Sequence, residues 1–419
     1  MSADCRMRSC RIRMKCITLA GLLSLPLMSS TAAGVDYSIS IRPQLNEYRT
    51  DSLFYVPKTV VSKPDTSSRT LFDLSLSQGD ITFLGSVSNE MAAEGKPTTR
   101  GIVKELYYSS ALSQWDLTIG RRVTSWGVGY GFRPLDVIQQ QNLQSTDVES
   151  LGGVNQLIAE RYWELSAAGI YLINPGESLD TRGSKQLALI GRYFSSLEEG
   201  DWQALLRYSD EHGLQGGIGG INIVSDALEL HSSLLYSPRY SKSIHSLAGQ
   251  SRTLLATVDP WRERGYKGGL RIMVGANWTW SERDNLIVEY WHDDFALSRD
   301  EWQALFTLAG DQRGLHSIPA LESAIHNNLA WSSQALQANS LMQKNLLLRW
   351  QHEGAEWQPA AALLITPDDG GRVTTLSLER KWQGLSMDAG LRLFDGPTDS
   401  AYGQVTRKRE LFITLYSEF

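Results

Sequence analysis

The sequence predicts an all-β protein, a transmembrane antiparallel β-barrel of about 18 strands, with 16 strands as the alternative. Three observations predict it. Segments of roughly ten residues alternate apolar and polar side chains and are separated by turns. After residue 33, no stretch approaches the ~20 consecutive apolar residues of a membrane helix. Short turns alternate with much longer connections, as expected when turns and loops emerge on opposite sides of a membrane.

The first 33 residues have the pattern of a secretory signal. Five basic residues precede the apolar run Cys16–Met28, and small residues follow at 31–33. The apolar run is too short to cross a bilayer as a helix. We therefore expect a removed signal peptide at 1–33 and a single barrel domain at 34–419. A basic tail is the alternative for the first segment.

The cysteine positions and the net charge limit the classes of protein to which the chain can belong. The three cysteines, Cys5, Cys10 and Cys16, all lie in the signal segment, so the remaining chain builds no disulfide. That segment also holds five of the 40 basic residues and one of the 46 acidic residues. The remainder is therefore acidic, with 35 basic against 45 acidic residues. This balance argues against nucleic acid as a partner.

Alternation with a period of two residues marks the strands. In Thr70–Ser77, Phe72 and Leu74 share one face and Asp73 lies on the other. Both chain ends should be periplasmic, which requires an even strand count, and the count becomes even when Val154–Ile173 is split around Trp163–Glu164. Further predicted strands are Ile81–Asn89, Gly101–Ser110, Trp115–Val123, Asn285–Asp293, Leu346–Gln351, Trp357–Ile365, Val373–Arg380, Leu385–Phe394 and Glu410–Phe419.

Two long connections have their own local signals. Ser298 and Glu301 form a capping box pattern, which predicts a short helix within Ser298–Gly310. A second helix is expected within Leu321–Gln337. The basic and polar stretch Pro238–Arg264 is expected to be a loop.

The stretch 124–153 is expected to fold into the lumen and to narrow it. Its glycines at 127, 129 and 131 allow the backbone to turn inward. Its aromatic side chains can pack against the wall and leave its Arg and Asp to line the narrowing. An ordinary packed extracellular loop is the alternative. The candidate constriction and solute-binding residues are Arg121, Arg122, Trp126, Tyr130, Arg133 and Asp136, together with Arg192, Arg207 and Arg392 on strands.

Charged residues fall on the faces that the alternation turns inward. A charge on the lipid face at mid-bilayer would cost ~2–4 kcal/mol for Arg or Lys, so these faces must meet water or partners. They provide polar filling, or a transverse field that sets charge preference, and the sign of that preference stays open. The residues concerned are Asp73, Glu105, Asp116, Arg122, Arg192, Arg207, Glu289, Glu379, Asp388 and Arg392.

No motif indicates an enzyme, a cofactor or a metal. The sequence contains no G-x-S-x-G nucleophile elbow, no H-E-x-x-H pair, no phosphate-binding loop and no dinucleotide fingerprint. His292, Asp293 and Asp294 form the densest polar triplet, which solvated residues at a strand end also explain. We expect no cofactor and no metal.

The run from Ile119 to Ile138 resembles porin-like bacterial outer-membrane proteins, with the alginate-export barrels as neighbours. Arg122 stands where Gln is usual, and Gln139-Gln140 stand where Asn-Pro is expected. The resemblance implies a porin-like barrel, and the terminal Phe419 resembles the aromatic residue that the outer-membrane insertion machinery reads. The matching residues are Gly120, Arg121, Trp126, Gly127, Asp136, Val137 and Ile138.

These observations predict a porin-like channel in the bacterial outer membrane. It would pass small hydrophilic solutes, anionic ones among them, by diffusion or export. Expected partners are outer-membrane lipids and lipopolysaccharide, with the protein a monomer. The alternatives are a barrel enzyme of lipase or protease type and a closed structural or adhesion barrel.

Overall fold

The computed structural model describes residues 35–55, 66–92, 97–140, 142, 152–174, 187–250 and 254–418. Contacts divide the chain into two units, Met1–Val35 and Asp36–Phe419. Apart from Val35, the first unit lies outside the described residues, and so do the predicted signal peptide and Phe419.

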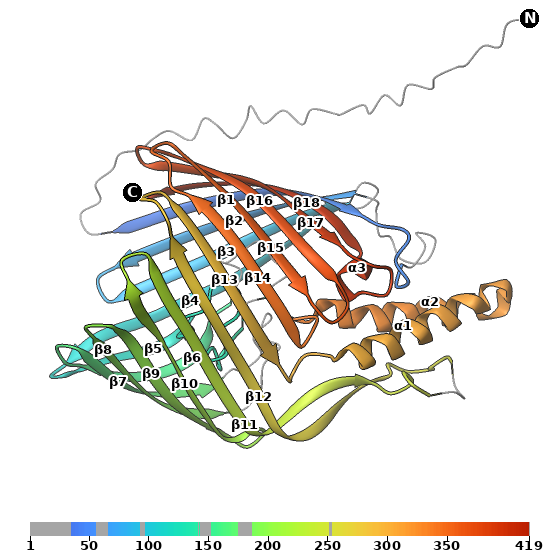
Figure 1. Cartoon of the computed structure of the whole chain (residues 1–419), viewed down its shortest axis with the longest axis horizontal. Helices are drawn as coiled ribbons and strands as arrows, with labels where there is room; N and C mark the ends of the chain where they lie inside the picture. The colour runs from blue at the N-terminus through green and yellow to red at the C-terminus, as the bar shows by residue number, and fades with distance from the viewer. Residues whose placement is uncertain are drawn as a thin grey trace, which may run out of the picture. The chain divides into compact units, whose positions relative to one another are not determined.

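Eighteen antiparallel strands form one closed sheet (Figure 1). Each strand pairs with the next in sequence, and β1 pairs with both β2 and β18, which closes the barrel. The predicted count of 18 is confirmed. The strands are β1 (Asp36–Tyr48), β2 (Thr66–Gln78), β3 (Ile81–Ala92), β4 (Thr98–Leu112), β5 (Trp115–Arg122), β6 (Val154–Tyr162), β7 (Ser166–Asn174), β8 (Ala188–Leu197), β9 (Gly200–Ser209), β10 (Gly213–Ser225), β11 (Leu228–His245), β12 (Trp261–Thr279), β13 (Asp284–Asp293), β14 (Lys344–His352), β15 (Trp357–Thr366), β16 (Gly371–Trp382), β17 (Leu385–Asp395) and β18 (Arg407–Glu418).

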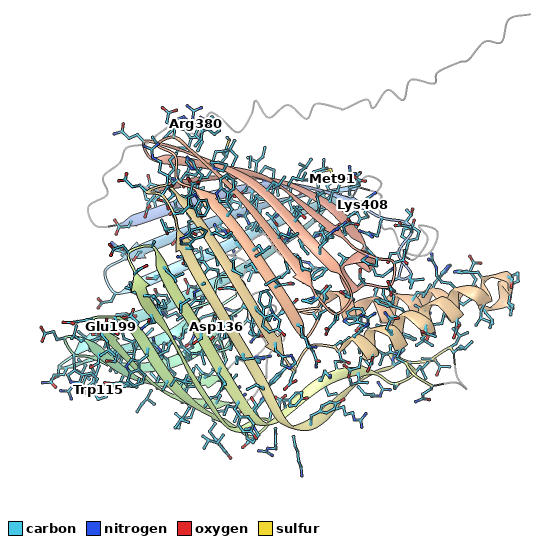
Figure 2. The ribbon with its side chains drawn as sticks, in the orientation of Figure 1. Met91, Trp115, Asp136, Glu199, Arg380 and Lys408 are labelled. Atoms are coloured by element: carbon cyan, nitrogen blue, oxygen red, sulfur yellow. The ribbon has the colours of Figure 1, made fainter. Side chains whose placement is uncertain are left out.

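The two ends of the barrel differ in their connections. At the end where β1 begins and β18 ends, which we call the turn end, the longest connections are 280–283 and 353–356. The opposite loop end carries 123–153 and 294–343. The even count and the split of Val154–Ile173 into β6 and β7 are thus confirmed. Figure 2 shows Trp115, Glu199 and Arg380 at the turn end, and Met91 and Lys408 at the loop end.

The two faces of the wall follow the predicted alternation. Ile119 and Leu157 point outward and stay at least half exposed, whereas Asp73 points inward and is buried. A bulge in the β3–β4 pairing, opposite Leu84 and Gly85, turns both Lys104 and Glu105 inward. The Lys104 ammonium pairs with the Asp73 carboxylate at 3.0 Å. Strict alternation predicted only Glu105, because it cannot foresee an extra residue in one strand.

The connection between β13 and β14 holds both predicted helices. The capping box is present, and α1 runs from Arg299 to Gly314 with Ser298 as its N-cap. Helix α2 spans Glu322–Ser332, and single 3-10 turns lie at 315–317, 319–321 and 333–337. No helix in the described ranges is long and apolar enough to cross a membrane.

The expected loop Pro238–Arg264 is wrong at both ends, where 238–245 and 261–264 are strand, whereas 246–260 do form the connection. Strands β11 and β12 continue as a hairpin that pairs down to His245 and Trp261, beyond the rest of the wall (Figure 1). Pairing skips Pro238 and the facing Gly268, which has a φ of 68°. Proline is tolerated there because the ladder is already interrupted.

Two apolar clusters fill space inside the wall. The loop-end cluster joins α1, α2 and α3 (Ala401–Gln404) to strands β13 and β15–β17 through residues such as Trp302, Phe306 and Tyr402. The wall cluster joins the 123–153 connection to strands β6–β9 and β11 through Trp126, Leu135 and their neighbours. Both clusters bring loop residues into contact with inward faces of strands.

Candidate functional site

The described part of the connection after β5, residues 123–140, runs across the inside of the barrel. We call it the crossing loop. Near its start, the Trp126 ring meets Tyr171 of β7 edge-on with centroids 4.8 Å apart, and the Trp126 carbonyl accepts a hydrogen bond from Gln203 of β9. Further along, the loop contacts Glu289 of β13. The loop therefore touches strands on two well-separated parts of the wall.

Asp136 holds the base of the crossing loop together. Its Oδ1 accepts hydrogen bonds from the backbone nitrogens of Trp126 and Gly127 at 2.7 and 2.8 Å, and its Oδ2 accepts one from the Ser125 hydroxyl at 2.7 Å. The residue is 2% exposed. Burial raises the pKa of Asp136, although these hydrogen bonds and the charge of Arg133 act in the opposite direction. Asp136 therefore shapes the loop, with its carboxylate oxygens committed to loop contacts.

Glu289 holds the tip of the crossing loop. Its two carboxylate oxygens accept from the backbone nitrogens of Tyr130 and Gly131 at 2.6 and 2.7 Å. The same carboxylate lies 2.8 Å from Nε2 of His231 on β11, and Glu289 is fully buried. A buried carboxylate needs such partners, because an unpaired charge there would be costly.

The glycines of the loop are required by close packing, which differs from the predicted reason. None of Gly127, Gly129 and Gly131 is among the glycines with positive φ. A Cβ on Gly129 would overlap the carbonyl oxygen of Phe132, and one on Gly131 would lie 2.7 Å from Cδ2 of Leu347. The backbone folds this tightly only without side chains at these positions.

The aromatic residues of the loop were expected to pack against the wall alike, but the structure separates them into buried and exposed ones. Trp126 and Phe132 are buried, and Phe132 stacks on Trp291 of β13 with centroids 5.7 Å apart. Tyr130 is 44% exposed and meets His231 edge-on. Burial, followed by the nearby Glu229 carboxylate, raises the pKa of Tyr130. Tyr130 is therefore an exposed ring at the tip of the loop.

Two of the predicted arginines flank the loop from the inward faces of strands. The Arg122 guanidinium lies 5.2 Å from the ring centroid of Tyr107. Arg192 of β8 donates from Nε to Oε1 of Gln203 at 2.9 Å and lies 5.7 Å from the Trp126 ring. Because Gln203 also donates to the Trp126 carbonyl, Arg192 helps to position the start of the loop.

Arg207 and Arg392 lie apart from each other. Arg207 is buried on β9 and donates to the side-chain oxygen of Gln215 on β10. Arg392 is buried on β17, pairs in register with Glu410 of β18 and stacks on Phe394. Strands β9 and β17 are eight positions apart in the ring of 18. The predicted arginines therefore do not form one cluster.

Two predicted site residues need correction. Arg121 pairs in register with the exposed Leu106 and with Asn155, so it belongs to the outward row and does not line the lumen. Arg133 supports the loop, since its Nε donates to the Gly129 carbonyl at 2.8 Å and its Nη1 donates to Ser125 at 3.1 Å. Strand alternation could have separated Arg121 from Arg122, but the contacts of Arg133 depend on the loop fold.

Sequence reasoning missed Arg349 on β14. Arg349 pairs in register with the buried Ile287, so it faces inward, and its Nη2 donates to Oε1 of Gln351 at 2.8 Å. The run Leu346–Gln351 has three consecutive leucines before this arginine, which obscures the alternation. A careful register from the clearer strand β13 could have found it.

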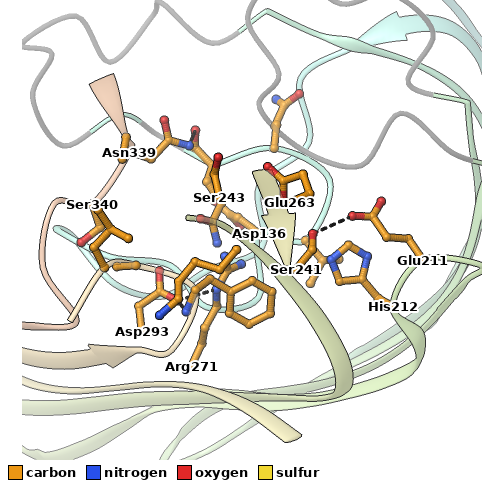
Figure 3. Close-up of a pocket in the computed structure, with 18 of the residues that line it drawn as sticks. Asp136, Glu211, His212, Ser241, Ser243, Glu263, Arg271, Asp293, Asn339 and Ser340 are labelled. Carbon is orange, nitrogen blue, oxygen red and sulfur yellow. Dashed lines mark hydrogen bonds and ion pairs between the residues drawn. The ribbon is translucent and has the colours of Figure 1, made fainter. Parts of the chain in front are cut away.

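A cavity of about 760 Å³ lies beside the crossing loop, toward the loop end. Residues 136–140, strands β9–β12 and residues 334–340 line it. Figure 3 shows Arg271 with Asp293 on one side and His212 with Glu211 and Ser241 on another. We call this space the outer cavity. Its lining mixes guanidinium, carboxylate, imidazole and amide groups with a few aromatic rings.

Comparison with known protein families and with curated sequences finds no match. Solved structures do match. OccAB1 of Acinetobacter baumannii is 9% identical with a TM-score of 0.53, over 92% of this chain and 96% of that chain. OccK11 (OpdR) and OccK8 (OprE) of Pseudomonas aeruginosa have a TM-score of 0.52 at 10% and 11% identity, over 92% of this chain and 96% and 98% of theirs.

The chain has the barrel fold of these proteins. The predicted fold class, a porin-like antiparallel β-barrel, is thereby confirmed. Identity this low shows the fold alone, so the function has to be inferred from this chain's own residues.

The described ranges contain no group of three or more His, Cys, Asp or Glu side chains that could hold a metal ion. In the triplet singled out from the sequence, His292 lies 2.8 Å from Asp294, while Asp293 binds Nε of Arg271 at 3.0 Å. The triplet therefore splits into two separate polar pairs.

Proposed function

We propose that this chain is an outer-membrane channel for small hydrophilic solutes, narrowed by the crossing loop and favouring anions. The observation that supports this proposal is the course of the crossing loop. It leaves the wall at β5 and is bound at its tip to Glu289 on β13, eight strands away in a ring of 18. A segment that joins nearly opposite walls divides the lumen, which supports a constriction at the position expected from the sequence.

The outer surface supports a place in a membrane. Outward-facing leucines and isoleucines are widely exposed, including Ile119, Leu157 and Leu206. Aromatic residues favour membrane interfaces, where one end of the ring is apolar and the other wet. Exposed tryptophans occur at or next to the turn end, namely Trp115, Trp163, Trp202, Trp278, Trp280, Trp357 and Trp382. We assign this end to the periplasm and propose a monomer in contact with outer-membrane lipid and lipopolysaccharide.

Three inward arginines support the preference for anions. Among the residues that the structure describes, Arg122, Arg192 and Arg349 contact neutral rings and amides and make no ion pair. Two other inward cations are balanced locally, since Lys104 pairs with Asp73 and Arg407 pairs with Glu410. Positive charge that no ion pair neutralises raises the concentration of anions in a narrow aqueous path.

Single-channel recording in planar bilayers tests the channel itself. The purified full-length protein should produce discrete conductance steps, and liposomes containing it should swell in solutions of small sugars. An absence of both would reject a channel and favour the closed structural barrel.

Reversal potentials in a salt gradient test the charge preference. Arg122→Gln and Arg349→Gln should each shift the reversal potential toward cations, because each removes an inward charge. Arg121→Gln is the matched control, since it changes the adjacent arginine on the outward row and should leave the potential unchanged. Equal shifts for Arg121 and Arg122 would reject the assignment.

We also propose that the chain is not an enzyme. Within the described part of the chain, a serine–histidine contact occurs between Ser332 and His245, at 3.5 Å, but Ser332 is fully buried and Nδ1 of His245 has no hydrogen-bond partner. A nucleophile needs access and an oriented base. Hydrolysis of a chromogenic ester that disappears in His245→Ala or His292→Ala protein would overturn this.

A further inference from the structure

The outer cavity contains a buried arginine whose charge is not neutralised by its hydrogen-bond partner. Arg207 is 6% exposed and donates from Nη1 to the amide oxygen of Gln215. Gln215 in turn donates to the hydroxyl of Ser237, and both residues are buried. This neutral relay fixes the direction of the guanidinium without supplying a negative charge. The charge of the Glu211 carboxylate acts on Arg207, but the two form no ion pair in the described part of the chain. A buried guanidinium is costly unless an anion faces it.

A second guanidinium faces the same cavity. Arg271 uses Nε to bind Asp293 at 3.0 Å and lies 3.8 Å from the ring centroid of Phe295 (Figure 3). Stacking and the carboxylate hold this side chain in one orientation. Two oriented arginines in one concave space can bind a carboxylate or phosphate through paired hydrogen bonds.

Other groups in the cavity lack partners. Gln139 is 5% exposed, and among the described residues neither its Nε2 nor its Oε1 has a hydrogen-bond partner. Nδ1 of the buried His212 has none either, and burial, followed by the charge of Arg207, lowers the pKa of His212. His212 is therefore neutral near pH 7. Buried polar groups are normally satisfied, so these unused donors and acceptors point to a polar ligand or water.

Acidic groups are present too, and they narrow the class of ligand. The Glu211 carboxylate accepts from the Ser241 hydroxyl at 3.1 Å, and Glu263 lines the same cavity. A ligand that was only an anion would gain nothing from these acceptors or from the side-chain oxygen of Gln139. A ligand with several hydroxyls can donate to them and accept from Gln139.

We propose that the outer cavity binds a polyhydroxylated solute that carries one oxyanion group, a sugar carboxylate or a sugar phosphate. Arg207 and Arg271 bind the oxyanion, and Gln139, His212 and Glu211 bind hydroxyls. A volume of about 760 Å³ is within the range of small-molecule sites. That the bound solute then passes the crossing loop rests on the channel function proposed above.

Isothermal titration calorimetry on the full-length protein in detergent tests the site without a membrane. The probes are glucuronate, glucose 6-phosphate, glucose and succinate. We expect glucuronate or glucose 6-phosphate to bind about tenfold or more tighter than glucose and succinate, since each of the latter lacks one of the two recognised features. The stronger of the two sugar anions identifies the oxyanion.

Variants separate the two halves of the site. Arg207→Gln should weaken binding of the sugar anion about tenfold or more, because a charge-assisted contact is lost. Gln139→Ala should reduce the preference for the sugar anion over succinate. Arg264→Gln, on an exposed part of β12 outside the cavity lining, is the matched control and should bind like the wild type. Arg207→Lys, which keeps the charge, should give an intermediate loss even if Arg207→Gln fails to fold.

Glucose binding as tightly as both sugar anions, or Arg207→Gln and Arg207→Lys both binding like the wild type, would overturn the proposal. Succinate binding as tightly as the sugar anions would overturn the role of the hydroxyl-binding groups. Conductance without sugar-anion binding rejects this site alone. Binding without conductance rejects the channel function and leaves the site.

Discussion

Glu289 and Tyr130 are 159 positions apart in the chain, yet the carboxylate of one lies 2.6 Å from the backbone nitrogen of the other. The second oxygen of Glu289 binds the next amide, that of Gly131, at 2.7 Å. One buried side chain on the wall therefore fixes two consecutive peptide groups at the tip of the crossing loop. This contact decides how far the loop reaches across the barrel.

Glu289→Gln should release the tip of the loop. The amide has one acceptor in place of two, so the nitrogens of Tyr130 and Gly131 can no longer both be satisfied, at a cost of about 1–3 kcal/mol. We expect a larger and noisier single-channel conductance. Glu229→Gln is the control. Glu229 also lies beside His231, 3.6 Å from its Nδ1, but the two loop amides are bound by Glu289. If both variants conduct like the wild type, Glu289 does not hold a constriction.

The pH dependence of stability should carry a contribution from Asp136. Burial raises its pKa above the ordinary 3.8, so the folded protein binds this proton more tightly than the unfolded chain. The contribution is therefore most favourable at low pH and is lost as pH rises from 3.8 through the raised pKa. Thermal unfolding should be measured from about pH 3 to pH 7. The stability of the wild type relative to Asp136→Asn should increase toward the acid end of this range. A difference that does not vary with pH would contradict the raised pKa.

Gly129→Ala should destabilise the crossing loop by about 1–3 kcal/mol, because the added methyl overlaps the Phe132 carbonyl and the backbone must shift. Thermal unfolding and conductance together measure the effect. Gly101→Ala is the control, since nothing lies within 4 Å of its added carbon. Equal behaviour of the two variants would show that the loop tolerates side chains.

Lys104→Met should destabilise the barrel by about 3–5 kcal/mol, because it leaves the Asp73 carboxylate buried without its partner. Denaturant unfolding checks the value. The double variant Asp73→Leu with Lys104→Met should recover much of the loss, since it removes both charges. Lys381→Met, in an exposed pair with Glu379, should change little. A small effect of the single Lys104 variant would mean that water reaches Asp73.

Strand identity was readable from the sequence because the outward face must be apolar and the lumen polar. The register of Asn285–Asp293 illustrates this. Glu289 faces inward as predicted, and Ile287 and Trp291, two residues away on either side, share its face. The helix after Ser298 was readable for another local reason, its capping box. Two features that depend on pairing with another strand were not predicted. The hairpin continues past Pro238, and a bulge turns Lys104 inward.

The candidate site was readable only in part. The sequence pointed to the loop after β5, and its contacts place it inside the wall. It did not assign roles, because Asp136 and Arg133 bind groups of the loop itself, whereas Tyr130 stays exposed. Such roles depend on which backbone groups come close after folding.

The sequence by itself determined an even-numbered barrel with turns at one end and loops at the other, since period-two alternation and connection length are local properties of the chain. The tertiary structure alone decided that Glu289 captures the loop tip and that Arg207 faces a cavity beside Gln139. Those pairs join segments far apart in sequence, and their geometry exists only once the sheet has closed and the loop has packed against it.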